Sequence, residues 1–480
     1  MDTLILYWNA TALEANLKSH TNGAKEQAGP PRSSRALAIV HLAMYDALAG
    51  ISKSPGTLPP YLPGLPIPPA GAGLEAAVAA AAFDTLVALF PTETPYFNTQ
   101  LAAAVIPAAG KAAGTAFGKA VAAAILADRA GDPSSSDVGY MPPVHAAAHQ
   151  RDPDNNGQGF HAPFYGAMSK CFAVSARHGL NAPPLPGDAD YSAALKEVRG
   201  KGIAPELMGT VPNAYPKRNI NQTLIGTYWG YDGAKGLGTP PRLYNQIVRG
   251  LAEKHLTTEP ENARLFFLLN IAMADAGIHA WHWKYVYDLW RPVVGIREAA
   301  PSVGPCATPG APIDATCDPA WHPLGAPKTN NQMNESNFTP NFPAYPSGHA
   351  TFGAAAFQVT RFFLRRKLGL AFGDRAPDAL TFDFVSDEHN GVNAGPDKLP
   401  RPRHNRRFAG LWRAIIENSI SRVFLGVHWR FDGFLEESDI ASTANKVGGV
   451  PLGLCIAEEI WARFETANMA AATTRKRGKG

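Results

Sequence analysis

The sequence predicts a mostly α-helical protein built as two packed bundles, which correspond roughly to the two halves of the chain. Three observations support this prediction. Apolar residues recur with helical spacing over long stretches, and several of these stretches are rich in alanine, the strongest helix former. We find no convincing β-hairpin and no regular alternation of strands with helices. Hydrophobic residues make up 45% of the 480 residues, which provides for a sizeable core.

The predicted helices follow one another with few breaks. Residues 36–49 are apolar with helical spacing, and this helix is predicted to end at Gly50. Stretches rich in Pro, Gly, Asn or Asp predict long loops, which are typical of functional or wrapping segments. The other predicted helices cover residues 76–90, 108–130, 261–287, 349–368, 411–425 and 428–447. The predicted loops cover residues 55–73, 132–186 and 301–346.

The charge pattern argues against two classes of protein. A net charge of +4 is too weak to indicate a nucleic-acid-binding or membrane-surface protein. Residues 54–74 and 336–360 carry no charge, but prolines interrupt both, so neither is predicted to span a membrane. The first residues lack the features of a secretory signal, and the compartment is left open. The basic stretch at the end of the chain predicts a flexible tail over residues 471–480.

Four cysteines in 480 residues do not form a disulfide framework. Cys171 and Cys455 are expected to be single buried thiols. Cys306 and Cys317 lie in one loop and could close a small ring, which the sequence leaves open.

Three segments of the C-terminal half carry candidate chemistry, and the first is residues 284–292 (KYVYDLWRP). Lys284 and Arg291 are seven residues apart, so near a helix end they project to nearly the same side. Pro292 indicates that the helix stops there. Two cations so placed suit an oxyanion. For this segment alone, a solvated basic face with a Lys284–Asp288 pair is the commoner interpretation.

The second segment is residues 343–352 (PAYPSGHATF). Ser347 precedes a strongly helical run and is predicted to cap it. The free backbone N–H groups of Gly348 and His349 would then lie at the positive end of the helix, where phosphate-like anions bind. The imidazole of His349 could act there as an acid or a base. The alternative is an ordinary capping serine followed by a partly buried histidine.

The third segment is residues 421–432 (SRVFLGVHWRFD). Gly426 is predicted to end one helix and His428 to begin the next, with Asp432 one turn beyond to orient the histidine ring. Alternatively, Arg422 forms a surface pair and His428 is structural. Taken together, the three segments predict an oxyanion site with two imidazoles, which needs no carboxylate ligands because its guest is anionic.

In this order, the segments resemble the signature of the superfamily that joins type 2 phosphatidic acid phosphatases, bacterial acid phosphatases and vanadium-dependent haloperoxidases. Over nearly the full chain, further stretches resemble the fungal vanadium chloroperoxidase type. The resemblance implies an all-α fold of two four-helix bundles with long connecting loops. We expect an N-terminal helical half at residues 1–200 and a bundle with the vanadate site at residues 201–470. The further stretches are residues 5–9, 29–35, 41–43, 231–233, 238–242 and 383–388.

The resemblance also implies a role for each matched residue. His428 would bond to vanadium through a ring nitrogen, and His349 would be the acid–base group. Asp232 matches a supporting acidic residue, and Lys284 would also polarise an oxygen of the peroxide. The oxygens of vanadate would be bound by Lys284, Arg291, Arg422, Ser347 and the backbone N–H of Gly348.

The implied activity is the oxidation of halide by hydrogen peroxide to hypohalous acid, which halogenates small organic acceptors. Vanadate would act as a Lewis acid without changing its oxidation state, and phosphate could occupy the site without it. Trp281 and Phe342 match positions that are aromatic in the chloride-oxidising type, so chloride is expected beside bromide. Alternatively, both are ordinary core aromatics. Neither a nucleic acid nor a membrane is an expected partner.

Three other functions remain open. A phosphatase would use the same pocket, with His428 as the nucleophile and His349 as the acid. A non-catalytic oxyanion-binding protein would not require His349. A zinc enzyme would use His279 and His282, three residues apart on a helix, but the sequence offers no fitting third ligand.

Overall fold

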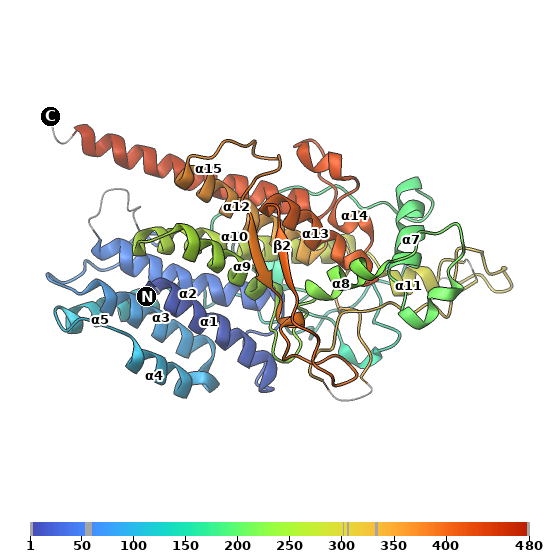
Figure 1. The fold of residues 1–480 in the computed structure, drawn as a ribbon, viewed down its shortest axis with the longest axis horizontal. Coiled ribbons are helices and arrows are strands. Elements are labelled where there is room, and N and C mark those ends of the chain that lie inside the picture. The colour runs from blue at the N-terminus through green and yellow to red at the C-terminus, as the bar shows by residue number, and fades with distance from the viewer. Residues whose placement is uncertain (1–2, 53–59, 301, 305–306, 332–334, 478–480) are drawn as a thin grey trace.

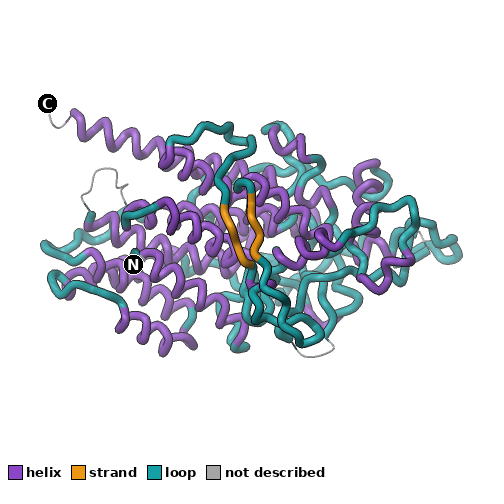
Figure 2. Tube along the Cα trace, viewed as in Figure 1, coloured by secondary structure: helices purple, strands orange, loops and turns teal. Residues whose placement is uncertain are grey.

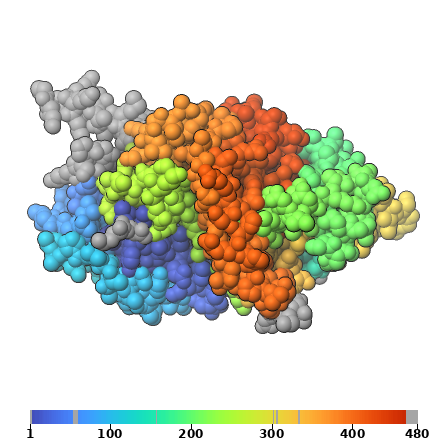
Figure 3. Space-filling view, viewed as in Figure 1, coloured from blue at the N-terminus to red at the C-terminus, as the bar shows by residue number. Residues whose placement is uncertain are grey.

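The computed structural model describes residues 3–52, 60–300, 302–304, 307–331 and 335–477, without the side chains of residue 156 and of residues 465–477. Its long helices lie side by side, and most of the connecting loops gather at one end of the molecule (Figures 1 and 2). The space-filling view shows one continuous body (Figure 3). The described residues are mainly helical, which confirms the predicted fold class.

The N-terminal helices form one bundle. The helices α2, α3 and α5 pack against one another, and α1 packs on α2 and α3. The contact between α3 and α5 brings the two backbones together, because a Cβ atom on Gly118 would lie 2.1 Å from the carbonyl oxygen of Ala77. Small residues on both helices therefore set the spacing. The bundle consists of α1 (Leu4–Thr21), α2 (Pro30–Ile51), α3 (Leu74–Leu89) and α5 (Lys111–Asp128), with the short α4 (Thr94–Ala103) beside α3.

The C-terminal helices form the second bundle around α12, which packs against α10, α13 and α15. The helix α10 also packs along α2 and so joins the two bundles. By length and composition α2 and α10 could each span a membrane, but 89% and 94% of their most apolar windows are buried inside the protein. The bundle consists of α10 (Glu259–Tyr287), α12 (Gly348–Leu368), α13 (Leu411–Phe424) and α15 (Gly449–Arg477).

Shorter elements fill the predicted loops and the space between the bundles. The helix α9 contacts both α2 and α12, whereas α7 and α11 pack on each other. The short α-helices are α6 (Tyr165–Met168), α7 (Ala189–Lys201), α8 (Ile220–Tyr228), α9 (Pro240–His255), α11 (Pro292–Arg297) and α14 (Arg430–Gly433). The 3-10 turns are η1 (Pro91–Glu93), η2 (Asn156–Gln158), η3 (Pro205–Thr210), η4 (Asp387–His389) and η5 (Glu437–Ala441).

A small antiparallel sheet is present that was not among the predicted elements. Strand β1 (Phe382–Val385) pairs with β2 (Asn405–Phe408), and Phe382 lies opposite Phe408 with the two rings stacked 4.8 Å apart. Residues 386–404 separate the strands. This connection is much longer than a hairpin turn, so no local turn signal marks the pair.

The predicted helix over residues 428–447 is wrong. The helix α14 ends at Gly433, and Phe434 is extended with φ of −168° and ψ of 158°. Gly433 lies directly against α13, since a Cβ atom there would be 2.1 Å from Ser419 Oγ. Conversely, α15 has no counterpart among the predicted helices, and it includes residues 471–477 of the predicted tail. The flexibility of that tail stays a prediction.

The described cysteines are free thiols, and Cys171 and Cys455 are half-buried and not fully buried as expected. The Sγ of Cys317 lies 3.1 Å from the carbonyl oxygen of Arg297. Cys306 lies outside the described residues, and with it the possible ring to Cys317.

Candidate active site

The candidate site begins at the C-terminal end of α10, where Lys284 is fully buried. The helix ends there because Asp288 adopts the left-handed conformation, with φ of 47°. Lys284 Nζ donates to the carbonyl oxygens of Pro343 at 2.7 Å and Ala344 at 3.1 Å. Burial, followed by repulsion from nearby guanidinium groups, holds its pKa well below the usual value. The alternative of a solvated basic face is therefore wrong.

Arg291 is the second buried cation, and it caps α11 immediately before Pro292. Its Nε donates to the carbonyl of Phe342 at 2.9 Å, and its Nη1 donates to the carbonyl of Val427 at 2.7 Å. The same Nη1 lies 2.9 Å from His428 Nε2. Arg291 thus joins the first and third segments to Phe342, the residue directly before the second segment.

The start of α12 follows the prediction. Ser347 caps the helix, and its Oγ accepts from the backbone N–H of Ala350 at 3.4 Å. His349 is buried, and its Nε2 has no hydrogen-bond partner among the described residues. Burial lowers the pKa of His349 well below 6.5, and Arg422 adds to the effect, so the ring is neutral at physiological pH. A neutral imidazole with a free Nε2 can accept or donate one proton.

His428 is held in one tautomer by its two neighbours. Its Nε2 faces the guanidinium of Arg291, which can only donate, so this nitrogen carries the lone pair. Its Nδ1 therefore carries the proton and donates to Asp432 Oδ2 at 2.7 Å. The backbone N–H of Trp429 donates to the same oxygen at 2.9 Å. Burial raises the pKa of Asp432 to about 7, opposed by Lys284 and Arg291.

Arg422 enters the site from α13 and forms a bidentate pair with Asp232. Its Nη2 and Nη1 donate to the two carboxylate oxygens at 2.7 and 3.0 Å. The side chains are 1% and 7% exposed, so the alternative of a surface pair is wrong. A bidentate pair fixes the plane of the guanidinium as well as its position. The N–H on Nε has no partner among the described residues.

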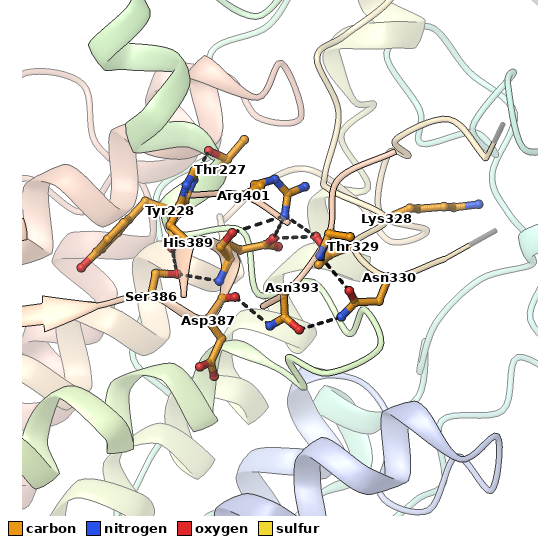
Figure 4. A network of polar contacts seen from close by, with 12 residues as sticks. Thr227, Tyr228, Lys328, Thr329, Asn330, Ser386, Asp387, His389, Asn393 and Arg401 are labelled. Atoms are coloured by element: carbon orange, nitrogen blue, oxygen red, sulfur yellow. Dashed lines mark hydrogen bonds and ion pairs between the residues drawn. The ribbon is translucent and has the colours of Figure 1, made fainter. Parts of the chain in front are cut away.

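Figure 4 shows a network of polar contacts around Asp387 and Arg401, and a hydrogen bond from Asp387 to Tyr231 joins this network to the loop that carries Asp232. Glu388 is fully buried and pairs with Arg401 at 2.5 Å. The backbone N–H of Asp387 donates to the hydroxyl of Tyr231 at 2.7 Å, directly before Asp232 in the chain. Burial raises the pKa of Glu388 to about 8. The segment around Asp387 and Arg401 thereby supports Tyr231 and Asp232, the residue that pairs with Arg422.

Two aromatic rings cover the opposite side of the site. Trp281 and Phe342 lie with ring centroids 4.8 Å apart, and Lys284 Nζ lies 5.7 and 5.0 Å from them. Trp281 lies one turn before Lys284 on α10. Both rings line the narrow hollow of the site, and both also pack with the hydrophobic core, so their role in halide choice stays a prediction.

The structure brings all ten predicted residues together. Seven of them line the hollow, and Lys284, Arg291 and Ser347 are buried beside it. Pro30, Pro240, Pro340 and Phe352 complete the wall and were not predicted as site residues, because their side chains carry no polar or titratable group. The seven are Asp232, Trp281, Phe342, Gly348, His349, Arg422 and His428.

The charges of the site are unbalanced in favour of an anion. Three basic side chains, Lys284, Arg291 and Arg422, share the site with two carboxyl groups, Asp232 and Asp432, and burial raises the pKa of Asp432 to about 7, which reduces the negative charge of the site. Buried donors on Arg291 Nη2 and Arg422 Nε have no partner among the described residues. Buried polar groups are rarely left unpaired, so these donors indicate an anionic guest.

Comparison with known proteins gives a close relative over most of the chain. The chain is 35% identical to the vanadium chloroperoxidase of Curvularia inaequalis over 565 aligned positions, which cover 95% of this chain and 89% of that protein. The chain belongs to the vanadium haloperoxidase family. Two family models agree: the vanadium chloroperoxidase N-terminal domain matches residues 2–171, and the second helical-bundle domain matches residues 264–441.

Solved structures of vanadium haloperoxidases share the fold. A bacterial vanadium-dependent iodoperoxidase gives a TM-score of 0.65 at 21% identity, covering 94% of this chain and 96% of its own. The apo and holo forms of a bacterial vanadium-dependent chloroperoxidase give TM-scores of 0.59 and 0.60 at 17% and 15% identity. They cover 89% and 90% of this chain, and 93% of their own chains in each case.

Membership of the vanadium haloperoxidase family implies a vanadate cofactor, and the site fits this anion. The unpaired N–H groups of Arg291 and Arg422 can donate to its oxygens, and His428 presents a nitrogen lone pair suited to bonding vanadium. The Asp432 carboxylate on Nδ1 raises the basicity of that nitrogen, as at many metal-bound histidines. Binding would exchange the hydrogen bond from Arg291 for the bond to vanadium.

Two further histidines of this protein lie near the site, and no sequence motif indicates them. His161 is half-buried with its ring centroid 6.2 Å from those of Trp281 and Phe342, and desolvation lowers its pKa to about 4. His149 is buried within the electric field of Arg291 and Lys284. Both come from the long predicted loop, where only the tertiary structure decides proximity.

The zinc alternative gains no support. Among the described residues there is no group of three or more side chains able to hold a metal ion. His279 Nδ1 lies 2.8 Å from the backbone carbonyl oxygen of Asp275, which occupies one ring nitrogen.

Proposed function

We propose that the protein uses vanadate and hydrogen peroxide to oxidise bromide and chloride to hypohalous acid, which halogenates small organic acceptors. Family membership supports a haloperoxidase that acts on peroxide and halide. The observation that carries the proposal is the buried His428, whose Nε2 lone pair faces the guanidinium of Arg291 and whose Nδ1–H is held by Asp432.

Each residue has a distinct task in this proposal. His428 bonds vanadium, while Lys284, Arg291 and Arg422 neutralise its oxygens. Ser347 and the Gly348 backbone N–H complete the cradle at the positive end of α12. Asp232 fixes the plane of the Arg422 guanidinium, whose Nε is left free to donate to an oxygen of vanadate. When bound, vanadate supplies a Lewis acid that activates peroxide without a change of oxidation state.

Proton transfer is the task of His349. Its free Nε2 faces the hollow, and its low pKa makes it a neutral base when peroxide arrives. After taking the peroxide proton, the ring can return it to the leaving oxygen as hypohalous acid forms. Lys284, with two of its N–H bonds committed to backbone carbonyls, directs its charge at the reacting oxygen.

The aromatic wall supports the choice of chloride. Trp281 and Phe342 present no hydrogen-bond donor to the hollow, because Trp281 Nε1 donates to the carbonyl of His161 at 3.2 Å. A halide that enters must therefore shed water against an apolar surface, which raises its reactivity. Chloride, the harder of the two halides to oxidise, gains more from this environment than bromide.

The test is halogenation of a dione that loses its absorbance when halogenated. Protein stripped of metal and phosphate is given peroxide with bromide or chloride, before and after orthovanadate is added. Activity that requires vanadate in both lanes is the expected result, and added phosphate should compete with vanadate for the site. Halogenation with bromide alone would contradict the chloride assignment. Absence of halogenation, with hydrolysis of a phosphate ester inhibited by vanadate, would establish the phosphatase alternative.

A further inference from the structure

The long loop over residues 132–164 forms a second cleft, separate from the hollow of the candidate site. Its volume is about 340 Å³, and its lining is mainly apolar. We call it the loop cleft. The lining consists of Pro142, Pro143, Val144, His145, Ala148, His149, Gln150, Arg151, Pro153, Phe160, Val294 and Glu298.

His149 is the unusual residue of the loop cleft. It is 2% exposed, and neither ring nitrogen has a hydrogen-bond partner among the described residues. Its ring packs edge-on against Phe160 with centroids 5.7 Å apart. Leaving a buried imidazole wholly unpaired is unfavourable, so such a group in the wall of a cleft indicates a ligand.

The backbone holds His149 firmly in place. Its N–H donates to the carbonyl of Asp288 at 2.7 Å, and Ala148 forms an antiparallel bridge with Leu289. These contacts join the loop cleft to the segment between Lys284 and Arg291. Burial and these two cations lower the pKa of His149 well below 6.5. The ring is therefore neutral and offers one donor and one acceptor.

We propose that the loop cleft binds small neutral phenols, with the ring between its apolar walls and the hydroxyl hydrogen-bonded to His149. A phenol hydroxyl both donates and accepts, so it satisfies either tautomer of the imidazole. Val144 and Val294 supply apolar walls, and the edge of Phe160 suits an aromatic guest. The walls carry both Arg151 and Glu298, so neither sign of ligand charge is favoured.

The position of the loop cleft gives the phenol a role. Phe160 lines the cleft, and the next residue, His161, contacts the rings of Trp281 and Phe342. The cleft thus holds an electron-rich arene close to the hollow where hypohalous acid would form. The role of phenols as the halogenated acceptors rests on the proposed function. The binding of phenols in the loop cleft does not depend on it.

Binding is measured without vanadate, peroxide or halide, so its failure is distinct from a failure of the proposed function. Calorimetric titrations with phenol and with toluene compare two guests that differ in the hydroxyl. We expect phenol to bind about tenfold more tightly, the equivalent of one hydrogen bond. His149→Phe should remove this preference while toluene still binds. His145→Phe is the matched control, since His145 lines the same cleft but is exposed, and the preference should persist.

Equal binding of phenol and toluene by the unchanged protein would overturn the proposal, as would a preference that survives His149→Phe. A crystal of the unchanged protein soaked in 4-bromophenol gives a result that does not depend on the folding of any variant. An anomalous bromine peak in the loop cleft, with the hydroxyl within 3.2 Å of a His149 ring nitrogen, is expected. A peak only elsewhere, or none, would overturn the proposal.

Discussion

Asp432→Asn isolates the contribution that the carboxylate holding His428 makes to the affinity for vanadate. The bond from Nδ1–H to Asp432 Oδ2 is 2.7 Å long and fully buried. A hydrogen bond to a charged group contributes about 1.5–3 kcal/mol, roughly twice a neutral one. Asparagine keeps the shape but not the charge. Losing the charged partner of a metal-bound histidine typically costs 10–100-fold in affinity, so the dissociation constant of vanadate should rise by about that factor.

The assay is a titration of metal-free protein with orthovanadate, followed by calorimetry and by recovered halogenation activity. His428→Ala should abolish tight vanadate binding, and it sets the lower limit of the measured affinity. Asp439→Asn is the matched control, because it makes the same substitution seven residues away, in η5, and should leave the affinity unchanged. An affinity of Asp432→Asn within threefold of the unchanged protein, at an unchanged melting temperature, would refute the reasoning.

The same carboxylate predicts a pH dependence. Burial raises the pKa of Asp432 to about 7, so its charge is lost as the pH falls through 7. The charged hydrogen bond to His428 weakens with it, and vanadate affinity should decrease from pH 8 to pH 5. In Asp432→Asn this component should be absent and the profile flatter, because the amide does not titrate. Parallel profiles for the two proteins would show that another group controls the dependence.

Three further predictions concern the wall, the cradle and the fold. Phe342→His places a polar ring in the wall, so kcat/KM for chloride should fall about tenfold while that for bromide changes little; equal losses would contradict the role of the wall. Gly348→Ala puts a methyl group 3.4 Å from the Trp281 ring, an ordinary contact, so thermal stability should hold while calorimetry shows weaker vanadate binding. Asp378→Ala leaves the buried Arg361 without its carboxylate partner, so urea unfolding should show the free energy of unfolding reduced by about 3–5 kcal/mol; an unchanged free energy of unfolding would contradict this.

The helices that the sequence predicted well have strong local signals. The apolar spacing of residues 261–287 and the cap at Ser347 are both present in the structure, because periodicity and capping act within a few residues. The helix expected over residues 428–447 failed because Gly433 is pressed against α13, a contact that no local pattern encodes. The β1–β2 pair was missed for a similar reason, since residues 386–404 separate its strands.

The sequence by itself predicted the chemical groups of the candidate site, because the residue types and spacings of three short segments indicate an anion cradle with two imidazoles. The tertiary structure decided how those groups act. Only folding brings Asp232 onto Arg422, 190 residues away, and directs the Arg291 guanidinium at His428 Nε2. Burial then sets the protonation state of both histidines, and it depends on packing from both bundles. The same packing places His149 in the loop cleft, where its ring nitrogens are left without a partner among the described residues.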